Sequence, residues 1–122
     1  MRTISGSIAL ALLSTTLLTS RALAHHGWTG YDEKQTLNLT GVIREMGYDN
    51  PHGFVNLQID NGKGKTWHAV LAPPSRMESR GLPKDMLKVG ATATIVGYPS
   101  RTIADELRAE RITVAGKTTE LR

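Results

Sequence analysis

Cysteine is absent from the 122-residue sequence. A disulfide framework, a thiolate nucleophile, a cysteine-ligated zinc site and a lipid attached through cysteine are therefore all excluded. The sequence also lacks a glycine-rich phosphate-binding loop and a His-Glu-x-x-His zinc motif. A domain built from this chain must rely on the packing of its apolar core for stability.

A large surplus of one charge sign is lacking as well. The formal net charge is +4, and removing Arg2 and Arg21 with a predicted leader leaves 4 minus 2, or +2. A protein that binds nucleic acid normally presents a much stronger basic surface. Nucleic acid is therefore not an expected partner.

Residues 1–24 have the pattern of a secretory signal peptide. A positive start at Arg2 precedes an apolar stretch from Ile8 to Leu18, and Ala22-Leu23-Ala24 supplies a small-x-small cleavage site. The uncharged run contains too much serine and threonine to match the roughly 20 apolar residues of a membrane span. Cleavage would leave 122 minus 24, or 98 residues. We expect a periplasmic or secreted single domain with no membrane span after cleavage.

Alternating apolar and polar residues predict a chain made mainly of strands. In the last of them the inward phase slips by one residue near Glu110-Arg111, which indicates a β-bulge. The Ser-x-x-Glu spacing of Ser75 and Glu78 predicts a capping box that opens a short helix, and Gly81 ends it. The five predicted strands span residues 37–46, 54–60, 66–72, 91–98 and 106–114.

The order of these elements predicts the fold class. Three strands, a short helical connection and two more strands match the connectivity of a five-stranded OB-like Greek-key barrel, an all-β fold. We expect an N-terminal segment at 25–36 and the barrel domain at 37–122. A turn at Asn61-Gly62-Lys63-Gly64 makes the second and third strands a hairpin, with Ile59 opposite Trp67. The predicted core contains Leu39, Ile43, Val55, Leu57, Ile59, Trp67, Ala69, Leu71 and Ile95.

Several short motifs together resemble a family of small exported bacterial proteins of uncharacterised function. The resemblance covers nearly all of the chain after residue 24 and implies an exported single domain with an OB-like barrel. It implies no activity. One departure is Tyr48, where the family pattern has tryptophan. The motifs are His25-His26-Gly27-Trp28, Asn50-Pro51-His52, Leu71-Ala72-Pro73-Pro74-Ser75-Arg76-Met77, Gly97-Tyr98-Pro99 and Arg108-Ala109-Glu110-Arg111-Ile112.

Histidines beside the predicted cleavage site suggest a copper site. If cleavage follows Ala24, the amine and ring of His25 can chelate Cu(II) together, with His26 or His52 as the next ligand. Cleavage after Ala22 would instead place His25 third in the chain, which is a square-planar Cu(II) or Ni(II) arrangement. The alternative is that His25 and His26 form a solvated terminus and that His52 only hydrogen-bonds its own loop.

A second hypothesis is a metal-independent binding surface for an envelope protein, a glycan or a small ligand. OB-folds bind ligands across the outer face of the second and third strands. The residues expected to line this surface are Trp28, Tyr48, Phe54, Arg76 and Arg101. Alternatively, Trp28 and Tyr31 pack the N-terminal segment over one open end of the barrel while Tyr98 closes the other. We expect His68 to be a surface strand residue opposite Gln58 and not a metal ligand.

No pair of carboxylates and no serine–histidine pair has a spacing that forces convergence, so we predict no catalytic residue. Oxidation by a copper bound at an N-terminal histidine is chemically conceivable, but a domain of this size offers little substrate platform. The sequence therefore predicts a small exported binding protein, with copper as its possible cofactor and an envelope protein or small ligand as its partner.

Overall fold

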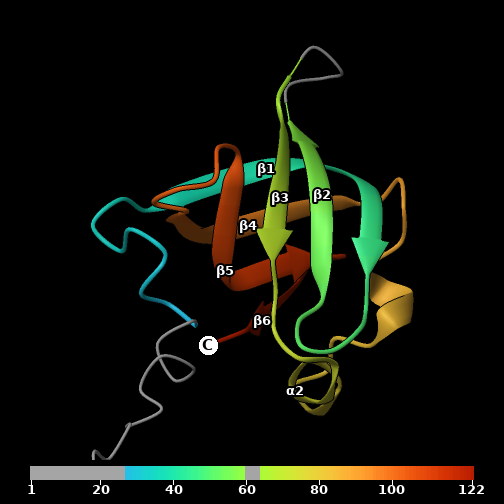
Figure 1. Ribbon diagram of the computed structural model, residues 1–122. Coiled ribbons are helices and arrows are strands. Elements are labelled where there is room, and N and C mark those ends of the chain that lie inside the picture. Colours follow the sequence, from blue (N-terminus) through green and yellow to red (C-terminus); the bar gives the residue numbers. More distant parts are fainter. Residues whose placement is uncertain (1–26, 60–63) are drawn as a thin grey trace, which may run out of the picture.

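The computed structural model describes residues 27–59 and 64–122 (Figure 1). The predicted signal peptide, His25 and His26 lie outside the described residues, as do residues 60–63 of the predicted turn. No helix within the described ranges is long and apolar enough to span a membrane.

Within residues 27–59 and 64–122, six strands, one short helix and one 3-10 turn follow each other. The first three strands precede the helix, and the rest follow the 3-10 turn. The elements are β1 (Leu37–Gly47), β2 (Phe54–Ile59), β3 (Thr66–Val70), α2 (Pro74–Ser79), η1 (Lys84–Met86), β4 (Thr92–Pro99), β5 (Glu106–Val114) and β6 (Lys117–Glu120).

The strands close into a barrel because β3 and β5 pair with each other. The sheet order is β3-β2-β1-β4-β5-β6, and the additional β3–β5 pairing is parallel while the other pairings are antiparallel. Closure of β1 to β5 gives the five-stranded mixed barrel of an OB-like fold, as predicted. The strand β6 was not predicted; it extends the sheet beyond β5.

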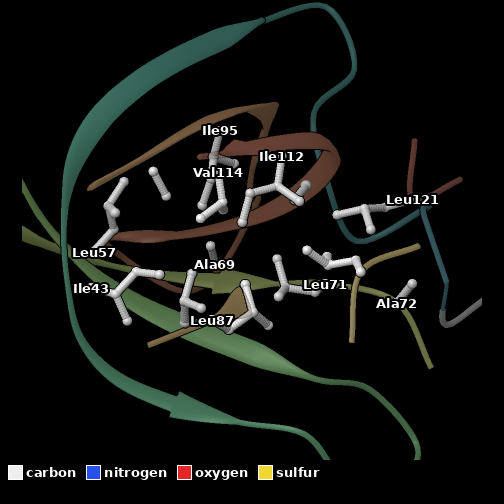
Figure 2. Packing of buried hydrophobic residues seen from close by; sticks show 14 of the residues in the cluster. Ile43, Leu57, Ala69, Leu71, Ala72, Leu87, Ile95, Ile112, Val114 and Leu121 are labelled. Carbon is white, nitrogen blue, oxygen red and sulfur yellow. The ribbon is translucent and has the colours of Figure 1, made fainter. Parts of the chain in front are cut away.

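The core fills the interior of this barrel, where alternate residues of the five strands point inward. Ile43, Val55, Leu57, Ala69, Leu71 and Ile95 are fully buried, as expected, and Leu39, Ile59 and Trp67 pack partly buried against them. Figure 2 shows Leu57, Ile95 and Ile112 approaching one another from different strands. The helix α2 adds Met77 from below the ends of β2 and β3 (Figure 1).

The predicted bulge in β5 is confirmed. Val96 pairs with Arg111 and Gly97 pairs with Ala109, so Glu110 is the extra residue. A Cβ at Gly97 would clash with the backbone carbonyl of Arg108, which only glycine avoids. The glycine therefore allows the two strands to stay paired across the bulge.

Two local predictions are wrong. The register of the β2–β3 hairpin is offset by two residues, so Leu57 and not Ile59 lies opposite Trp67, and Asn56 and not Gln58 lies opposite His68. An offset of two preserves the face of every side chain, which is why the core prediction survives.

The predicted capping box is the other error. The helix α2 begins two residues earlier than a cap at Ser75 requires, at Pro74, with Pro73 at the N-cap position and no side-chain cap. Proline suits this position because its fixed φ is helical and its missing N–H would be unpaired there. Ser75 is therefore inside the helix. Gly81 ends the helix as expected, with a φ of 85° and with the Leu82 N–H donating to the Met77 carbonyl at 2.8 Å.

Truncating Leu57 to alanine is expected to lower the free energy of unfolding by about 2 to 5 kcal/mol. The substitution removes a fully buried side chain and leaves a cavity in the core. Chemical denaturation monitored by circular dichroism measures the loss. Val89→Ala is the matched control, since Val89 is 62% exposed, and its effect should stay within about 0.5 kcal/mol. Equal losses in the two variants would contradict the assigned core.

Candidate functional site

The N-terminal segment, residues 27–36, is held against the end of β4 by backbone hydrogen bonds. Tyr31 forms an isolated antiparallel bridge with Ser100. The Asp32 N–H donates to the Pro99 carbonyl at 2.9 Å, and the Arg101 N–H donates to the Gly30 carbonyl at 2.9 Å. The segment is thus fixed in place on the barrel from Gly30 onwards.

The ring of Trp28 contacts two guanidinium groups. Arg108 of β5 lies 4.8 Å from the ring centroid and Arg122 lies 4.3 Å from it. Each such contact favours the cation because the face of the indole ring is electron-rich. The Tyr98 ring meets Trp28 edge-on with centroids 6.1 Å apart. The expectation that Trp28 and Tyr98 close opposite ends of the barrel is therefore wrong, because the two rings are in contact.

Arg108 is the centre of this arrangement, and it is only 5% exposed. Its Nη1 donates to the Gly27 carbonyl at 2.9 Å, while its buried Nε has no hydrogen-bond partner among the described residues. Burial lowers the pKa of Arg108, and Arg76 and Arg122 lower it further while Tyr31 raises it. A buried cation without a carboxylate is unusual and costly.

The charge of Arg108 acts on His52. The side chain is half-buried in the loop before β2. Burial lowers the pKa of His52 from its ordinary value of 6.5, and the positive charges of Arg108 and Arg76 lower it further. The imidazole is therefore kept neutral near pH 7, which is the state that binds a metal or accepts a hydrogen bond.

Tyr31 and Glu106 form a half-buried pair beside Arg108. The Tyr31 hydroxyl donates to Glu106 Oε2 at 3.0 Å. Burial raises the pKa of Tyr31 to about 12, with the hydrogen bond to Glu106 and its charge adding to the effect. Glu106 is thus already engaged, as are the carboxylates of Glu33 and Glu110, which form ion pairs with Arg122.

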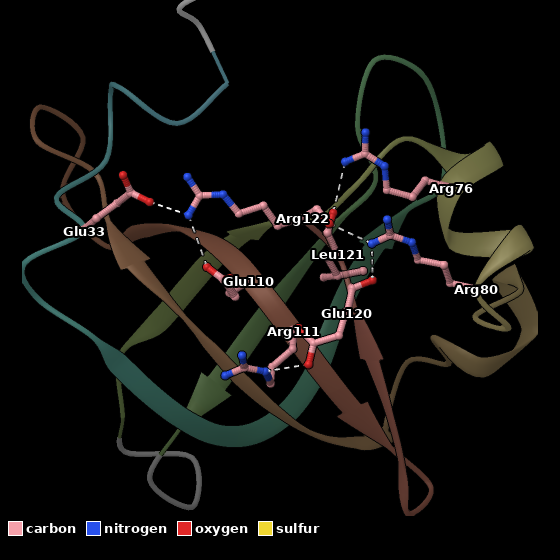
Figure 3. A network of polar contacts seen from close by, with 8 residues as sticks. All are labelled: Glu33, Arg76, Arg80, Glu110, Arg111, Glu120, Leu121 and Arg122. Carbon is pink, nitrogen blue, oxygen red and sulfur yellow. Dashed lines mark hydrogen bonds and ion pairs between the residues drawn. The ribbon is translucent and has the colours of Figure 1, made fainter.

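Arg76 of α2 and Arg80, which directly follows the helix, bind the end of β6 and the two residues after it. Arg76 Nη1 donates to the Leu121 carbonyl at 3.2 Å, and Arg80 Nη1 donates to the Glu120 and Arg122 carbonyls at 2.9 Å. Figure 3 shows both side chains reaching from the helix to this strand end. Neither guanidinium forms an ion pair with a carboxylate of the described residues.

A second group of polar side chains lies on the outer face of β2 and β3. The His68 ring stacks on Phe54 with centroids 4.9 Å apart at 34°. Its Nδ1 is 2.7 Å from Asn56 Oδ1, and Asn56 Nδ2 donates to Glu45 Oε2 at 2.9 Å. Because the carboxylate fixes the orientation of the amide, His68 Nδ1 must be the donor. The Nε2 atom is then left as a hydrogen-bond acceptor.

The structure brings together three of the residues expected at a binding site. Trp28 contacts Arg108, and the charge of Arg108 acts on His52 as that of Arg76 acts on Arg108. Phe54 lies two strands away across β3, where Val70 separates it from Arg108. The other two have structural partners. The Tyr48 hydroxyl donates to the Leu82 carbonyl at 2.6 Å, and Arg101 lies 3.8 Å from Asp32 in an ion pair.

Sequence patterns missed Arg108, Tyr31 and Glu106 as members of the site. Their positions in β5 could have indicated Glu106 and Arg108, because these two residues alternate with the inward-facing Leu107 and Ala109 and so share the outer face of the strand. His68 was expected to be a surface residue, but its side chain is partly buried and its ring packs against Phe54. Among residues 27–59 and 64–122, no three histidine, aspartate or glutamate side chains converge on a metal position.

Comparison with known proteins identifies the family. A family model described as a family of unknown function (DUF6152) matches residues 12–107. The chain belongs to this family. For DUF6152 the description gives no activity, so the match supports the predicted relationship to an uncharacterised family and adds no role for any residue. Comparison with curated proteins gives no match.

One solved structure similar to this DUF6152 chain is the crystal structure of a complex of TiaS with a transfer RNA and ATP. The two share 17% sequence identity with a TM-score of 0.50, over 75% of this chain and 20% of the other. This chain thus corresponds to about a fifth of that protein. At this identity the likeness shows the fold alone.

The titration of His52 provides a test of the site's electrostatics. Removing a nearby positive charge stabilises the imidazolium, so Arg76→Gln should raise the pKa of His52 towards 6.5. In the unmodified protein, neutral His52 should contribute stability that is present above pH 6.5 and lost as the pH falls through its lowered pKa.

NMR titration of the histidine ring protons measures both effects. Arg80→Gln is the matched control, because Arg80 also extends from α2 to the chain end but is not among the charges acting on His52. An unchanged pKa in Arg76→Gln, or an equal rise in Arg80→Gln, would contradict the assigned geometry.

Proposed function

We propose that this protein is an exported, non-enzymatic binding protein that binds Cu(II) through the amine and ring of His25, with His26 or His52 as the next ligand. The observation that carries the proposal is the hydrogen bond from Arg108 to the Gly27 carbonyl at 2.9 Å. Arg108 is also a charge that acts on His52. Gly27 is therefore held by an arginine whose charge also acts on His52, and His25 precedes Gly27 by two residues.

The chemistry of the donors supports copper. A terminal amine has an unperturbed pKa near 7.7 to 8.0 and an imidazole one near 6.5, so both lose their protons at modest cost near neutral pH. The lowered pKa of His52 makes its lone pair available at still lower pH. In a chain without cysteine, histidine and the terminal amine are suitable donors for Cu(II).

The two arginines beside His52 work against a bound cation. Arg108 and Arg76 both disfavour positive charge at His52. We therefore propose that His25, whose amine and ring bind Cu(II) together, contributes most of the copper affinity. His26 or His52 contributes less. Met46 and Met77 are not assigned as ligands, because Met46 is part of β1 and packs against the core while Met77 is fully buried.

Copper titration of the processed protein tests the proposal. Mass spectrometry of the exported protein first establishes its N-terminal residue, because an uncleaved or tagged chain has no free amine at His25. His25→Ala should weaken Cu(II) binding by about 100-fold, or about 2.7 kcal/mol. Binding by the unmodified protein should weaken as the pH falls, because protons compete for the same nitrogens.

Variants of the other histidines define the remaining ligands. His52→Ala should weaken binding less than His25→Ala does, and His68→Ala is the matched control because Asn56 already holds its Nδ1 atom. A mature chain that begins after Trp28, or equal copper affinity in His25→Ala, would refute the copper proposal.

A second candidate function is metal-independent binding of an envelope protein, a glycan or a small ligand on the outer face of β2 and β3. The stack of His68 on Phe54 supports it, since the stack presents an aromatic surface beside the Nε2 atom, for which residues 27–59 and 64–122 supply no hydrogen-bond partner. The hydrogen bonds through Asn56 to Glu45 hold that acceptor in a fixed direction. Such a preorganised surface costs little entropy to bind.

Affinity capture from periplasmic extract tests this second function. The unmodified protein should retain a partner or glycan that Phe54→Ala and His68→Ala lose, with thermal melting used to check that both variants stay folded. Val89→Ala is the matched control, because it also removes an apolar side chain from the surface. Retention that is the same in all four proteins would exclude this face as the binding surface.

A further inference from the structure

A row of polar side chains crosses the outer face of the barrel from β1 to β5. Glu45 pairs with Asn56, and His68 pairs with Asn56 on one side and with Glu106 on the other. The order of strands is visible in Figure 1, where β3 lies between β2 and β5. Because paired residues of neighbouring strands point to the same face of a sheet, these four side chains form one outer row.

Hydrogen bonds fix the orientation of the groups in this outer row. The Asn56 amide donates to Glu45 Oε2 at 2.9 Å, and its Oδ1 accepts from His68 Nδ1 at 2.7 Å. Since Nδ1 faces β2, the Nε2 atom of the same ring is turned away from β2. At the other end, Glu106 Oε2 accepts from the Tyr31 hydroxyl at 3.0 Å. Within residues 27–59 and 64–122, no hydrogen bond reaches His68 Nε2 or Glu106 Oε1.

The ring of Phe54 lies beside the outer row and is held from two sides. A Cβ at Gly47, its partner on β1, would clash with the Phe54 ring, so the ring lies over the glycine backbone. On β3, the His68 ring packs against it with centroids 4.9 Å apart. Because both neighbours fix the ring, it offers a preorganised aromatic surface next to the acceptor Nε2.

The outer row carries negative charge that no cation of the described chain balances. The ion pairs within residues 27–59 and 64–122 include neither Glu45 nor Glu106. Lys65, which precedes β3, is paired with Asp105 at 3.3 Å. Arg108 donates to the Gly27 carbonyl instead. The charge of the row is therefore complementary to a cationic group on a partner.

We propose that the outer row and Phe54 bind an arginine side chain of a partner protein. The inference rests on the second candidate function and names the chemistry of its ligand. A guanidinium is planar and has five donors, so it can pair with Glu106 and His68 Nε2 while its face lies on the Phe54 ring.

Arginine fits these groups better than the other ligands that bind aromatic surfaces. The ammonium of lysine is a strongly hydrated point charge, and it cannot stack as a plane on the Phe54 ring. Sugar hydroxyls accept as well as donate hydrogen bonds, whereas Glu106 Oε1 and His68 Nε2 both accept. A neutral glycan would also leave the carboxylate of Glu106 without a cation.

NMR titration of the processed, metal-free protein with N-acetyl-arginine amide tests the inference, with the His68 ring protons followed at constant pH and ionic strength. Arginine amide should shift these resonances in a saturable way. The citrulline analogue, which has nearly the same shape and no charge, should bind at least about 10-fold more weakly. The lysine analogue should bind about 3-fold more weakly than arginine. Equal binding of the arginine and citrulline compounds overturns the inference, as does tighter binding of lysine.

Two variants locate the binding. Glu106→Gln should weaken arginine binding by about 10-fold, or about 1.4 kcal/mol, because it removes the charge and keeps an acceptor for Tyr31. Phe54→Leu should weaken binding by about 3-fold, because it keeps an apolar side chain and removes the aromatic face. Glu78→Gln is the matched control, since Glu78 is an exposed carboxylate of α2 outside the row. Equal effects of Glu106→Gln and Glu78→Gln would contradict the assigned site, provided that thermal melting shows all variants folded.

The outcome can be distinguished from a failure of the second candidate function. Capture of a partner that depends on Phe54 and His68, without any binding of arginine amide, would leave that function intact and overturn only this inference. Saturable arginine binding that Glu106→Gln weakens supports the inference even where the extract yields no partner.

Discussion

The parallel pairing of β3 with β5 is the constraint on which the rest of the structure depends. His68 pairs with Glu106 and Val70 pairs with Arg108 in this contact, so it closes the barrel and gives the core its inner surface. Because the two strands are paired, the outward side chains of β5 lie next to those of β3. Without it, Arg108 would be an ordinary surface residue at one edge of an open sheet, far from the loop that contains His52.

The buried charge of Arg108 bears on the proposed copper site, because Arg108 holds Gly27 and its charge acts on His52. A copper ion at His52 would add positive charge where Arg108 and Arg76 already disfavour it. The cost of burying Arg108 is offset in part by the ring of Trp28, whose face lies against it.

Local patterns predicted most of the fold and only part of the site. The alternation in β1, β2 and β5 and the phase slip at Glu110 are local, and each was found correctly because strand periodicity is a property of neighbouring residues. The β2–β3 register depends on the geometry of the connecting turn, and an error of two residues there concealed the Asn56–His68 contact. The strand β6 was missed because Lys117–Glu120 has only one buried side chain, Thr119. Arg108 was missed as a member of the site because the side chain that packs against it, Trp28, is 80 residues away in the sequence.

The position of Trp28 also gives the protein an optical property. Indole fluorescence and near-ultraviolet circular dichroism depend on the groups around the ring, and here those groups are Arg108, Arg122 and Tyr98. Release of the N-terminal segment from the barrel would replace all three with water. The sequence contains one other tryptophan, Trp67, which lies on β3 and would keep its surroundings. The intrinsic emission of the protein therefore reports directly whether the N-terminal segment is docked.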